Sequence, residues 1–242
     1  MTSQQLKITL FDIPSIARKS WSPNVWKVRL ALNYKALPYS TEWLQFSNLS
    51  TNMLPHVEPN RPPLSPHTIP CILFREGETT RGIMGSRAIA EALEKRSSLP
   101  SLRLEAKESA KVEQLAEKLL VASRPLWAHL LPKILTESSG EYYSATRAKR
   151  FGTSLDLYYT EHVSQHLWNH LDAMCIDIGE SLAQTPGPYL LGHHPTYADF
   201  TVVALIKFFR CVDKAMADHF CSVEPQLRKL YEACYQWLER DN

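Results

Sequence analysis

The features that this sequence lacks exclude several classes of protein. No apolar run approaches the roughly 20 residues that a membrane-spanning helix requires, so we expect no membrane association. The first residues, up to Lys7, carry neither the charged region nor the long apolar region of a secretory signal. The formal net charge is only +2 and is evenly spread, which gives no basic surface for a nucleic acid.

Cysteine is scarce and irregularly placed. The five cysteines are odd in number, scattered, and include no C-x-x-C pair. This distribution argues against a disulfide scaffold and against a zinc ribbon, and it favours a reducing compartment. We therefore expect a cytoplasmic protein without a bound metal. The sequence also contains no internal repeat and no low-complexity tract.

What is present describes an ordinary globular chain with an alternating first part. The 242 residues, 44% of them hydrophobic and 21% charged, suffice for one large domain or two modest ones. Within residues 6–95 the hydrophobic patterns predict alternating strands and helices. The expected strands span 8–13, 39–44, 70–74 and 80–83, and the expected helices span 23–34 and 86–95. A proline-rich stretch over 45–68 predicts a loop with one helical turn near 50–54.

The second part of the chain is helical throughout. A change of composition over residues 96–101 indicates an interdomain linker. Beyond it, apolar periodicity predicts helices over 104–136, 144–184, 196–213 and 224–240. The breaking cluster Thr185-Pro186-Gly187-Pro188 separates the second of these from the third. We therefore expect an α/β domain over residues 1–96 and an all-helical domain over residues 104–242.

The most informative stretch, Trp21-Ser22-Pro23-Asn24, lies where the first strand gives way to the first helix. Proline suits the first helical position because its ring fixes φ and its missing N–H is not needed there. The free backbone N–H groups and the positive end of the helix dipole then face whatever lies beside Ser22. Two interpretations are open: Ser22 caps the helix, as serine often does, or its hydroxyl and the helix start together bind a sulfur anion.

Two further motifs stand at the edges of the predicted strands. Pro70 opens the third strand, and a cis Ile69–Pro70 bond would offer the backbone N–H and C=O of Ile69 to a peptide-like ligand. Gly85-Ser86 leads from the fourth strand into a helix, and the glycine suggests a positive φ. Ser86 at that helix start can bind a carboxylate through its hydroxyl and the local N–H groups.

A fourth motif completes an ordered set. Thr196 and Asp199 have the spacing of a capping box just before the apolar run 200–209. Taken in order, the Ser-Pro, Ile-Pro, Gly-Ser-Arg-Ala-Ile and Thr-x-x-Asp motifs resemble the glutathione S-transferase superfamily over residues 8–238, nearly the whole chain. The segment Ser-Pro-Asn-Val-Trp-Lys-Val-Arg is most similar to fungal serine-type members of the etherase-like and Ure2p-like branches. The resemblance implies a thioredoxin-like N-terminal domain followed by an all-helical C-terminal domain.

The resemblance also implies which residues bind glutathione. A thiolate needs a hydrogen-bond donor and a positive dipole beside its sulfur, and Ser22 at a helix start supplies both. Asn24, in the first helical turn, is a second donor, whereas Ser20 is a rival that lacks the following proline. Because a hydroxyl cannot form a mixed disulfide, a thioltransferase mechanism at this position is disfavoured. Ile69, before Pro70, would pair with the cysteinyl unit of glutathione.

The γ-glutamyl end of the ligand meets a departure from the family pattern. Ser86 would hold the γ-glutamyl carboxylate, but the family usually places Glu or Asp where this chain has Gly85. Losing that charge-assisted contact to the ammonium group is expected to weaken glutathione binding by about 1.5–3 kcal/mol. The departure keeps a non-catalytic, ligand-binding or regulatory protein as an alternative to an enzyme.

Aromatic and histidine residues supply the remaining candidates. Trp21 and Trp127 are expected to contact a hydrophobic substrate, with Tyr142 and Tyr143 in the same pocket between the domains. We place Phe208 and Phe209 in the core instead. Three histidines repeat every four residues on one helix face, and without a partner carboxylate motif we expect a partly exposed face rather than a metal site. They are His162, His166 and His170.

These residues together predict a glutathione transferase-like enzyme. Ser22 would stabilise the glutathione thiolate, which attacks a small electrophilic molecule, aromatic or unsaturated. Addition followed by elimination in the same pocket would instead give a glutathione-dependent cis–trans isomerase. The resemblance further implies a homodimer and, among fungal relatives, a place in secondary metabolism.

Overall fold

The N-terminal half of the molecule is a small sheet with helices beside it. The structure is a computed structural model that describes residues 6–241, so residues 1–5 of the predicted first domain and Asn242 lie outside the described part. We use "N-terminal half" for residues 6–96 and "helical half" for residues 104–241. The elements of the N-terminal half are β1 (Lys7–Asp12), α1 (Pro23–Tyr34), β2 (Ser40–Trp43), α2 (Leu49–Met53), β3 (Cys71–Glu76), β4 (Thr79–Met84) and α3 (Ser86–Arg96).

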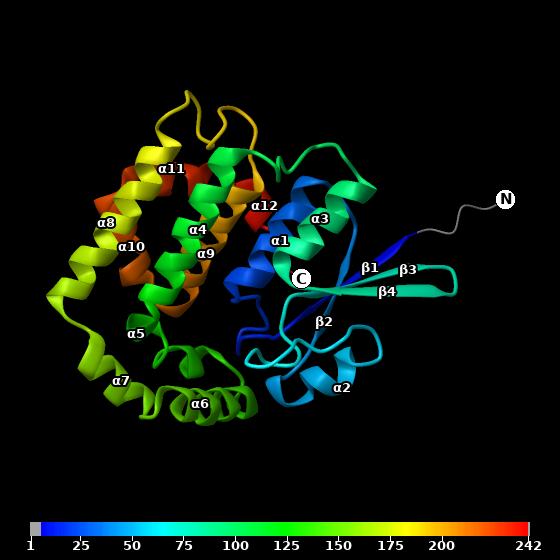
Figure 1. The fold of residues 1–242 in the computed structure, drawn as a ribbon, viewed down its shortest axis with the longest axis horizontal. Coiled ribbons are helices and arrows are strands. Elements are labelled where there is room, and N and C mark those ends of the chain that lie inside the picture. The colour runs from blue at the N-terminus through cyan, green and yellow to red at the C-terminus, as the bar shows by residue number, and fades with distance from the viewer. Residues whose placement is uncertain (1–5, 242) are drawn as a thin grey trace.

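The four strands form one mixed sheet in the order β2-β1-β3-β4. β2 runs parallel to β1, with Thr9 opposite Ser40, because α1 carries the chain back between them. β3 pairs with β1 and with β4 in the antiparallel sense, and a short turn joins β3 to β4. α1 and α3 lie on the side of the sheet that faces the helical half, and α2 lies on the other side (Figure 1). This is a thioredoxin-like arrangement, as the sequence predicts.

Helix α1 is buried nearly all round because it is enclosed between the sheet and the helical half. It packs against α3 on one side and against α9 (Tyr197–Val212) on the other. Even its charged residues are covered: the Arg29 guanidinium is 0% exposed and donates to Asp12 at 3.0 Å. A buried charge is tolerated only when it is paired, and here the Asp12 carboxylate provides the pairing. The position of Ser22 is therefore set by a helix with little freedom to move.

The helical half is a bundle built around α9. Its other elements are α4 (Lys107–Ala122), α5 (Arg124–Trp127), a 3-10 helix (Leu131–Ile134), α6 (Glu137–Phe151), α7 (Leu155–His162), α8 (Gln165–Leu182), α10 (Lys214–Val223), α11 (Pro225–Ala233) and α12 (Tyr235–Leu238). α9 contacts α1, α4, α10 and α11, and its residues from Tyr197 to Ile206 are all buried. It begins at the predicted capping box, in which Asp199 accepts from the Thr196 N–H at 2.7 Å.

The strands and helices predicted for the N-terminal half are confirmed within about two residues, but the long helices predicted for the helical half are wrong. The helix expected over 104–136 ends at Ser123, and prolines then limit the chain to α5 and a 3-10 helix. The helix expected over 144–184 is broken at Gly152, whose φ of +75° ends α6, and again before Ser164, which caps α8. Apolar periodicity continues across these breaks, so periodicity alone does not locate the ends of the separate helices.

The C-terminal end of the chain also differs from the sequence prediction. α10 was not predicted, because it follows α9 with only Asp213 between them. The Asp213 carboxylate accepts from the Ala215 N–H at 2.9 Å and so starts a new helix at once. The single helix expected over 224–240 is divided at Cys234 into α11 and α12. No helix within residues 6–241 is both long and apolar enough to cross a membrane.

Candidate functional site

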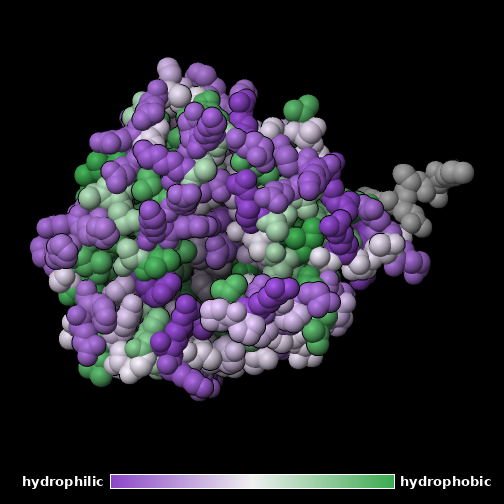
Figure 2. Space-filling model, in the orientation of Figure 1, coloured by the Kyte–Doolittle hydropathy of each residue, from purple (hydrophilic) through white to green (hydrophobic). Residues whose placement is uncertain are grey.

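A cavity of about 350 Å³ lies between the two halves of the molecule. On the face drawn in Figure 2 it appears as a hollow between the helical half and the sheet. One wall comes from residues 21–24, 46, 49–50 and 65–69 of the N-terminal half, and the other comes from α4, α5, the 3-10 helix (Leu131–Ile134), α6 and α9. We call these the N-terminal wall and the helical wall. This is the volume of a small-molecule site, and a junction of two units is a common place for one.

Ser22 belongs to the N-terminal wall. It is the residue before α1, its backbone is extended, and its carbonyl accepts from the Trp26 N–H at 3.0 Å. Its side chain, by contrast, forms no hydrogen bond within the described residues and does not cap the helix. Of the two interpretations that the sequence leaves open, side-chain capping is therefore not the one observed. The Ser22 hydroxyl is free to meet a ligand in the cavity.

The neighbours of Ser22 are placed differently from one another. Trp21 and Asn24 line the cavity with it. Ser20 does not: it is 1% exposed and lies behind the wall, beside the buried Asp12 carboxyl group. Burial raises the pKa of Asp12, and nearby Arg29 and Ser20 oppose that rise. The rival serine is thus directed to the interior rather than to a ligand.

The Ile-Pro and Gly-Ser motifs meet at the edge of the same wall. The Ile69–Pro70 bond is cis, and Ile69 lines the cavity. The Gly85 N–H donates to the Pro70 carbonyl at 3.0 Å, and Gly85 has a φ of +94°, the positive value that the sequence suggests. Pro70, Gly85 and Ser86 do not themselves line the cavity. Ile69 and Ser22 therefore line the same cavity, whereas Gly85 and Ser86 lie outside its lining.

Aromatic side chains join the two walls. Trp127 stacks edge-on against Phe208 with ring centroids 5.0 Å apart, and its indole N–H donates to Ser123. Trp21 lies 6.4 Å from Phe208 and 6.4 Å from Phe46. Phe208 is 1% exposed, as expected of a core residue, and also lines the cavity as part of the helical wall.

The predicted tyrosines contribute to the helical wall. Tyr142 is exposed and stacks on Phe46 at 5.8 Å, whereas Tyr143 is buried. Burial raises the pKa of Tyr143 to about 12, although three nearby guanidinium groups favour its phenolate form. Tyr143 is therefore a neutral hydrogen-bond donor at ordinary pH. Phe209 faces away from the cavity and packs against Phe220 in the core, as predicted.

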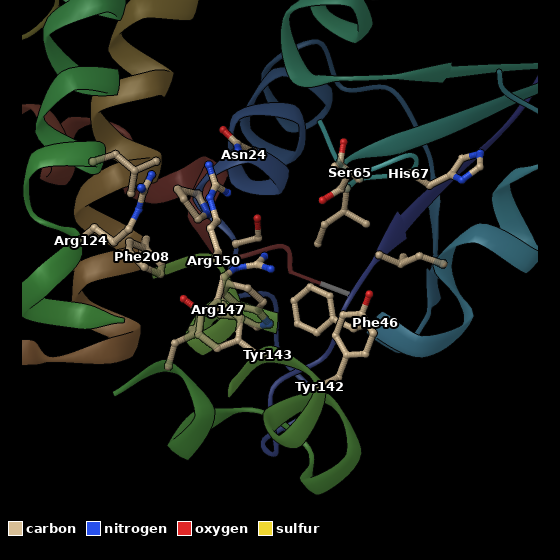
Figure 3. Close-up of a pocket in the computed structure, with 18 of the residues that line it drawn as sticks. Asn24, Phe46, Ser65, His67, Arg124, Tyr142, Tyr143, Arg147, Arg150 and Phe208 are labelled. Atoms are coloured by element: carbon tan, nitrogen blue, oxygen red, sulfur yellow. The ribbon is translucent and has the colours of Figure 1, made fainter. Parts of the chain in front are cut away.

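The sequence analysis missed the arginines of the helical wall. Arg124 on α5 and Arg147 and Arg150 on α6 all line the cavity. Figure 3 shows Arg147 and Arg150 between Tyr143 and Asn24. A signal was available, because Tyr143, Arg147 and Arg150 are spaced by four and three residues and so share one face of a helix. Without the fold, that face is indistinguishable from a solvated one.

The histidine series does not form a metal centre. His162 ends α7, whereas His166 and His170 belong to α8, so the prediction of one shared helix face is wrong. The Ser164 side chain accepts from the Leu167 N–H at 3.2 Å and starts the second helix between them. All three histidines are exposed. Among residues 6–241, no group of three or more potential metal ligands comes together.

A thioredoxin-like sheet domain followed by an all-helical domain is the fold of the glutathione transferase class of proteins. The family models for the N-terminal and C-terminal domains of glutathione S-transferase match residues 21–96 and 106–237. This chain belongs to the glutathione S-transferase family.

Individual relatives agree with this assignment. The chain is 27% identical to the glutathione S-transferase-like protein ustS of Aspergillus flavus, over 98% of this chain and 93% of the relative. The crystal structure of glutathione transferase GSTFuA3 from Phanerochaete chrysosporium is 26% identical, with a TM-score of 0.82 over 96% of this chain and 97% of the other. CsGST63524 of Ceriporiopsis subvermispora, crystallised with glutathione, shares the fold at 23% identity, with a TM-score of 0.80 over 95% and 97% of the two chains.

Proposed function

We propose that this protein is a glutathione transferase in which Ser22 stabilises the thiolate of glutathione for attack on a small electrophile. The observation that carries the proposal is the Ser22 hydroxyl, which has no described protein partner and stands at the N-terminus of α1 on a cavity wall. A donor held at a helix start favours a developing negative charge beside it. No described residue lining the cavity is acidic, so nothing there opposes a sulfur anion.

The chemistry would run between the two walls. The glutathione thiol loses its proton to solvent, and the Ser22 hydroxyl donates a hydrogen bond to the resulting thiolate. The sulfur then forms a bond to an electrophilic carbon of a substrate packed against Trp21, Trp127 and Phe208, and a leaving group departs with its electron pair. The aromatic contacts would hold a flat substrate within reach of the sulfur.

Glutathione would lie along the N-terminal wall. Ile69 offers its backbone to the cysteinyl unit, and Asn24 is a second polar group near the sulfur. Ser86 at the start of α3 would hold the γ-glutamyl carboxylate behind Ile69. A relative of the same fold crystallised with glutathione supports this choice of co-substrate.

The test compares Ser22→Ala with Ser20→Ala. Both substitutions remove one hydroxyl, but only Ser22 faces the cavity. We expect Ser22→Ala to lower kcat/KM for conjugation of 1-chloro-2,4-dinitrobenzene by about 10² to 10³, the loss typical of one donor to a reacting anion. Its pH–rate profile should move to higher pH, because the bound thiol becomes a weaker acid. Isothermal titration should show glutathione still bound, and Ser20→Ala should keep the wild-type profile.

Three outcomes would contradict the proposal. Full activity in Ser22→Ala would move the sulfur contact to Asn24 or to the substrate. A loss confined to Ser20→Ala would make the buried serine the active one. If wild-type protein bound no glutathione at millimolar concentration, the chain would be a ligand-binding member of the family without the transfer reaction.

A further inference from the structure

The arginines of the cavity all lie on one side of it. Among its described lining residues are three arginines and one histidine, and neither aspartate nor glutamate. The arginines Arg124, Arg147 and Arg150 all belong to the helical wall, whereas the N-terminal wall presents hydroxyl, amide and backbone groups and the His67 imidazole. In the chain as a whole the two signs nearly cancel, so this separation is a property of the cavity and not of the composition.

These guanidinium groups form few polar interactions with the described residues of the protein. No ion pair joins Arg124, Arg147 or Arg150 to a carboxylate of the described residues. Arg147 lies over the Tyr143 ring at 4.9 Å and otherwise donates only to the hydroxyl of its neighbour Thr146. Arg124 and Arg147 are half-buried rather than fully solvated. Half-buried cations without an anionic partner are what an anion-binding wall requires.

Their position separates them from the expected glutathione contacts. Glutathione would follow Ile69 and the start of α3, which belong to the N-terminal half. Arg147 and Arg150 rise from α6 on the opposite wall (Figure 3). Aromatic rings line the cavity from both walls: Phe46 and Trp21 from the N-terminal wall and Tyr142 from the helical wall. The Phe46 and Tyr142 rings are stacked, and the Trp21 ring is tilted by 50° to Phe46.

Given the glutathione transferase activity proposed above, we infer that the electrophilic acceptor is a planar aromatic molecule that carries a carboxylate, and that Arg147, with Arg124 and Arg150, binds this carboxylate. The guanidinium fork matches a carboxylate in two parallel hydrogen bonds, and the aromatic rings pack on the plane of the acceptor. The charge would then orient the reactive carbon toward the sulfur beside Ser22. Specificity for an acid would reside in α5 and α6 rather than in the glutathione-binding motifs.

A matched pair of acceptors tests the inference. We would compare 4-chloro-3,5-dinitrobenzoate with its methyl ester, in which an uncharged ester group replaces the carboxylate. Because the ester group activates the ring more strongly, each kcat/KM is compared relative to the rate constant of the same acceptor without protein. In both reactions the sulfur bonds to the carbon that bears chlorine, chloride leaves with the bonding electrons, and the thiol proton passes to solvent. The protein-catalysed rate is taken after subtracting the rate without protein. We expect wild-type kcat/KM to be at least about tenfold higher for the acid, the low end for a charge-assisted contact.

The variants are Arg147→Gln and, as control, Lys149→Gln. Both remove one positive charge from α6, but Lys149 is exposed and lies outside the cavity. We expect Arg147→Gln to raise KM for the acid by about tenfold to a hundredfold and to leave the ester and glutathione unchanged. Lys149→Gln should leave all three KM values unchanged. Added salt should weaken use of the acid in wild type more than use of the ester.

Several results would overturn the inference, and they differ from failure of the transfer reaction. Equal use of acid and ester, with both conjugated, would mean a neutral acceptor while leaving the role of Ser22 intact. A rise in glutathione KM in Arg147→Gln would assign the arginine to a glutathione carboxylate instead. If neither acceptor is conjugated, the binding affinities of unreactive 3,5-dinitrobenzoate and its methyl ester, measured by titration, still test the inference. Tighter binding of the acid that is lost in Arg147→Gln supports the inference, and equal binding overturns it.

Discussion

The two walls of the cavity are built by different means. The N-terminal wall consists of short motifs at the ends of regular elements, and each motif carries its geometry locally: a proline after Ser22 and a cis proline after Ile69. The helical wall consists of side chains that project from helices α4, α5, α6 and α9, and no local motif marks them. A site of this kind therefore has one half that a sequence specifies directly and one half that only packing assembles.

The difference matters for function, because the two walls would serve different ligands. The N-terminal wall offers uncharged donors beside Ser22, suited to a sulfur anion that is the same in every turnover. The helical wall offers aromatic rings and arginines, suited to a particular class of acceptor. Changes in helix surface residues could then alter the acceptor without disturbing the co-substrate.

The largest loss of stability is expected from substitution of Asp199, because it holds the start of α9, a helix that contacts both walls of the cavity. Asp199 is fully buried and accepts from the Leu190 N–H at 2.8 Å and from the Thr196 N–H and hydroxyl at 2.7 and 2.8 Å. Asp199→Ala would leave these donors buried without partners at the start of α9, which contacts α1 and carries Phe208 to the cavity. We expect a loss of about 3–5 kcal/mol in the free energy of unfolding, measured by urea denaturation. Glutathione and acceptor binding should then fail together.

The same residue gives a pH dependence with a definite sign. Burial raises the pKa of Asp199 to about 6, despite the hydrogen bonds that favour its carboxylate. The folded protein then keeps this proton at pH values where the unfolded chain, with an ordinary pKa of 3.8, has lost it. Its contribution to stability is therefore largest below about pH 4 and is lost as the pH rises to about 6.

Asp199→Asn is the matched variant for this pH dependence, because its side chain has the same shape and does not titrate. The free energy of unfolding of wild type relative to Asp199→Asn should decrease between about pH 4 and pH 6. An unchanged or increasing difference over that range would show that the Asp199 pKa is not raised in the folded protein.

A smaller effect is expected where the walls are joined at the cavity edge. The Gln45 side-chain carbonyl accepts from the Thr136 hydroxyl at 2.7 Å and from the Ser139 hydroxyl at 2.5 Å. These bonds connect α6 to the 3-10 helix Phe46–Asn48, which follows Gln45. Gln45→Ala would remove this acceptor and destabilise the protein by about 2 kcal/mol. We expect KM for the acceptor to rise several-fold while glutathione affinity, measured by titration, stays the same.

Gln45→Glu is the control for that substitution. Its carboxylate can accept from both hydroxyls, so it should restore most of the stability and the acceptor KM. If Gln45→Ala weakened glutathione and acceptor equally, the walls would not act separately in the way described above.

The two walls also differ in how well the sequence predicts them. The capping box, the Ser-Pro helix start and the positive φ at Gly85 are local, since each depends on a few consecutive residues, and each is found where it was predicted. The arginines of α6 could not be assigned, because a charged helix face looks the same whether it meets solvent or a cavity. Phe208 is a similar case: its burial was predictable, but its position in the helical wall depends on how α9 packs.

The structure shows where the predicted site residues lie, and their roles are the subject of the proposed experiments. Trp21, Ser22, Asn24, Ile69 and Trp127 are brought to one cavity, as their motifs and spacing suggest. Ser86 lies behind that cavity, and its proposed contact with glutathione therefore depends on how the ligand extends past Ile69.

The smallest expected effect concerns this corner and tests whether the N-terminal wall can be improved on its own. Gly85 has a φ of +94°, and a Cβ built there meets no atom within 4 Å, so a side chain fits but strains the backbone. Gly85→Asp would place a carboxylate beside Ser86, where the family usually has an acid. We expect a stability loss of about 1 kcal/mol from the backbone and a tighter glutathione complex by titration calorimetry.

Gly85→Asn is the control, because it carries the same backbone strain without the charge. An affinity gain confined to Gly85→Asp, with the acceptor KM unchanged, would place the γ-glutamyl ammonium at this corner. Equal affinity in the two variants would place it elsewhere.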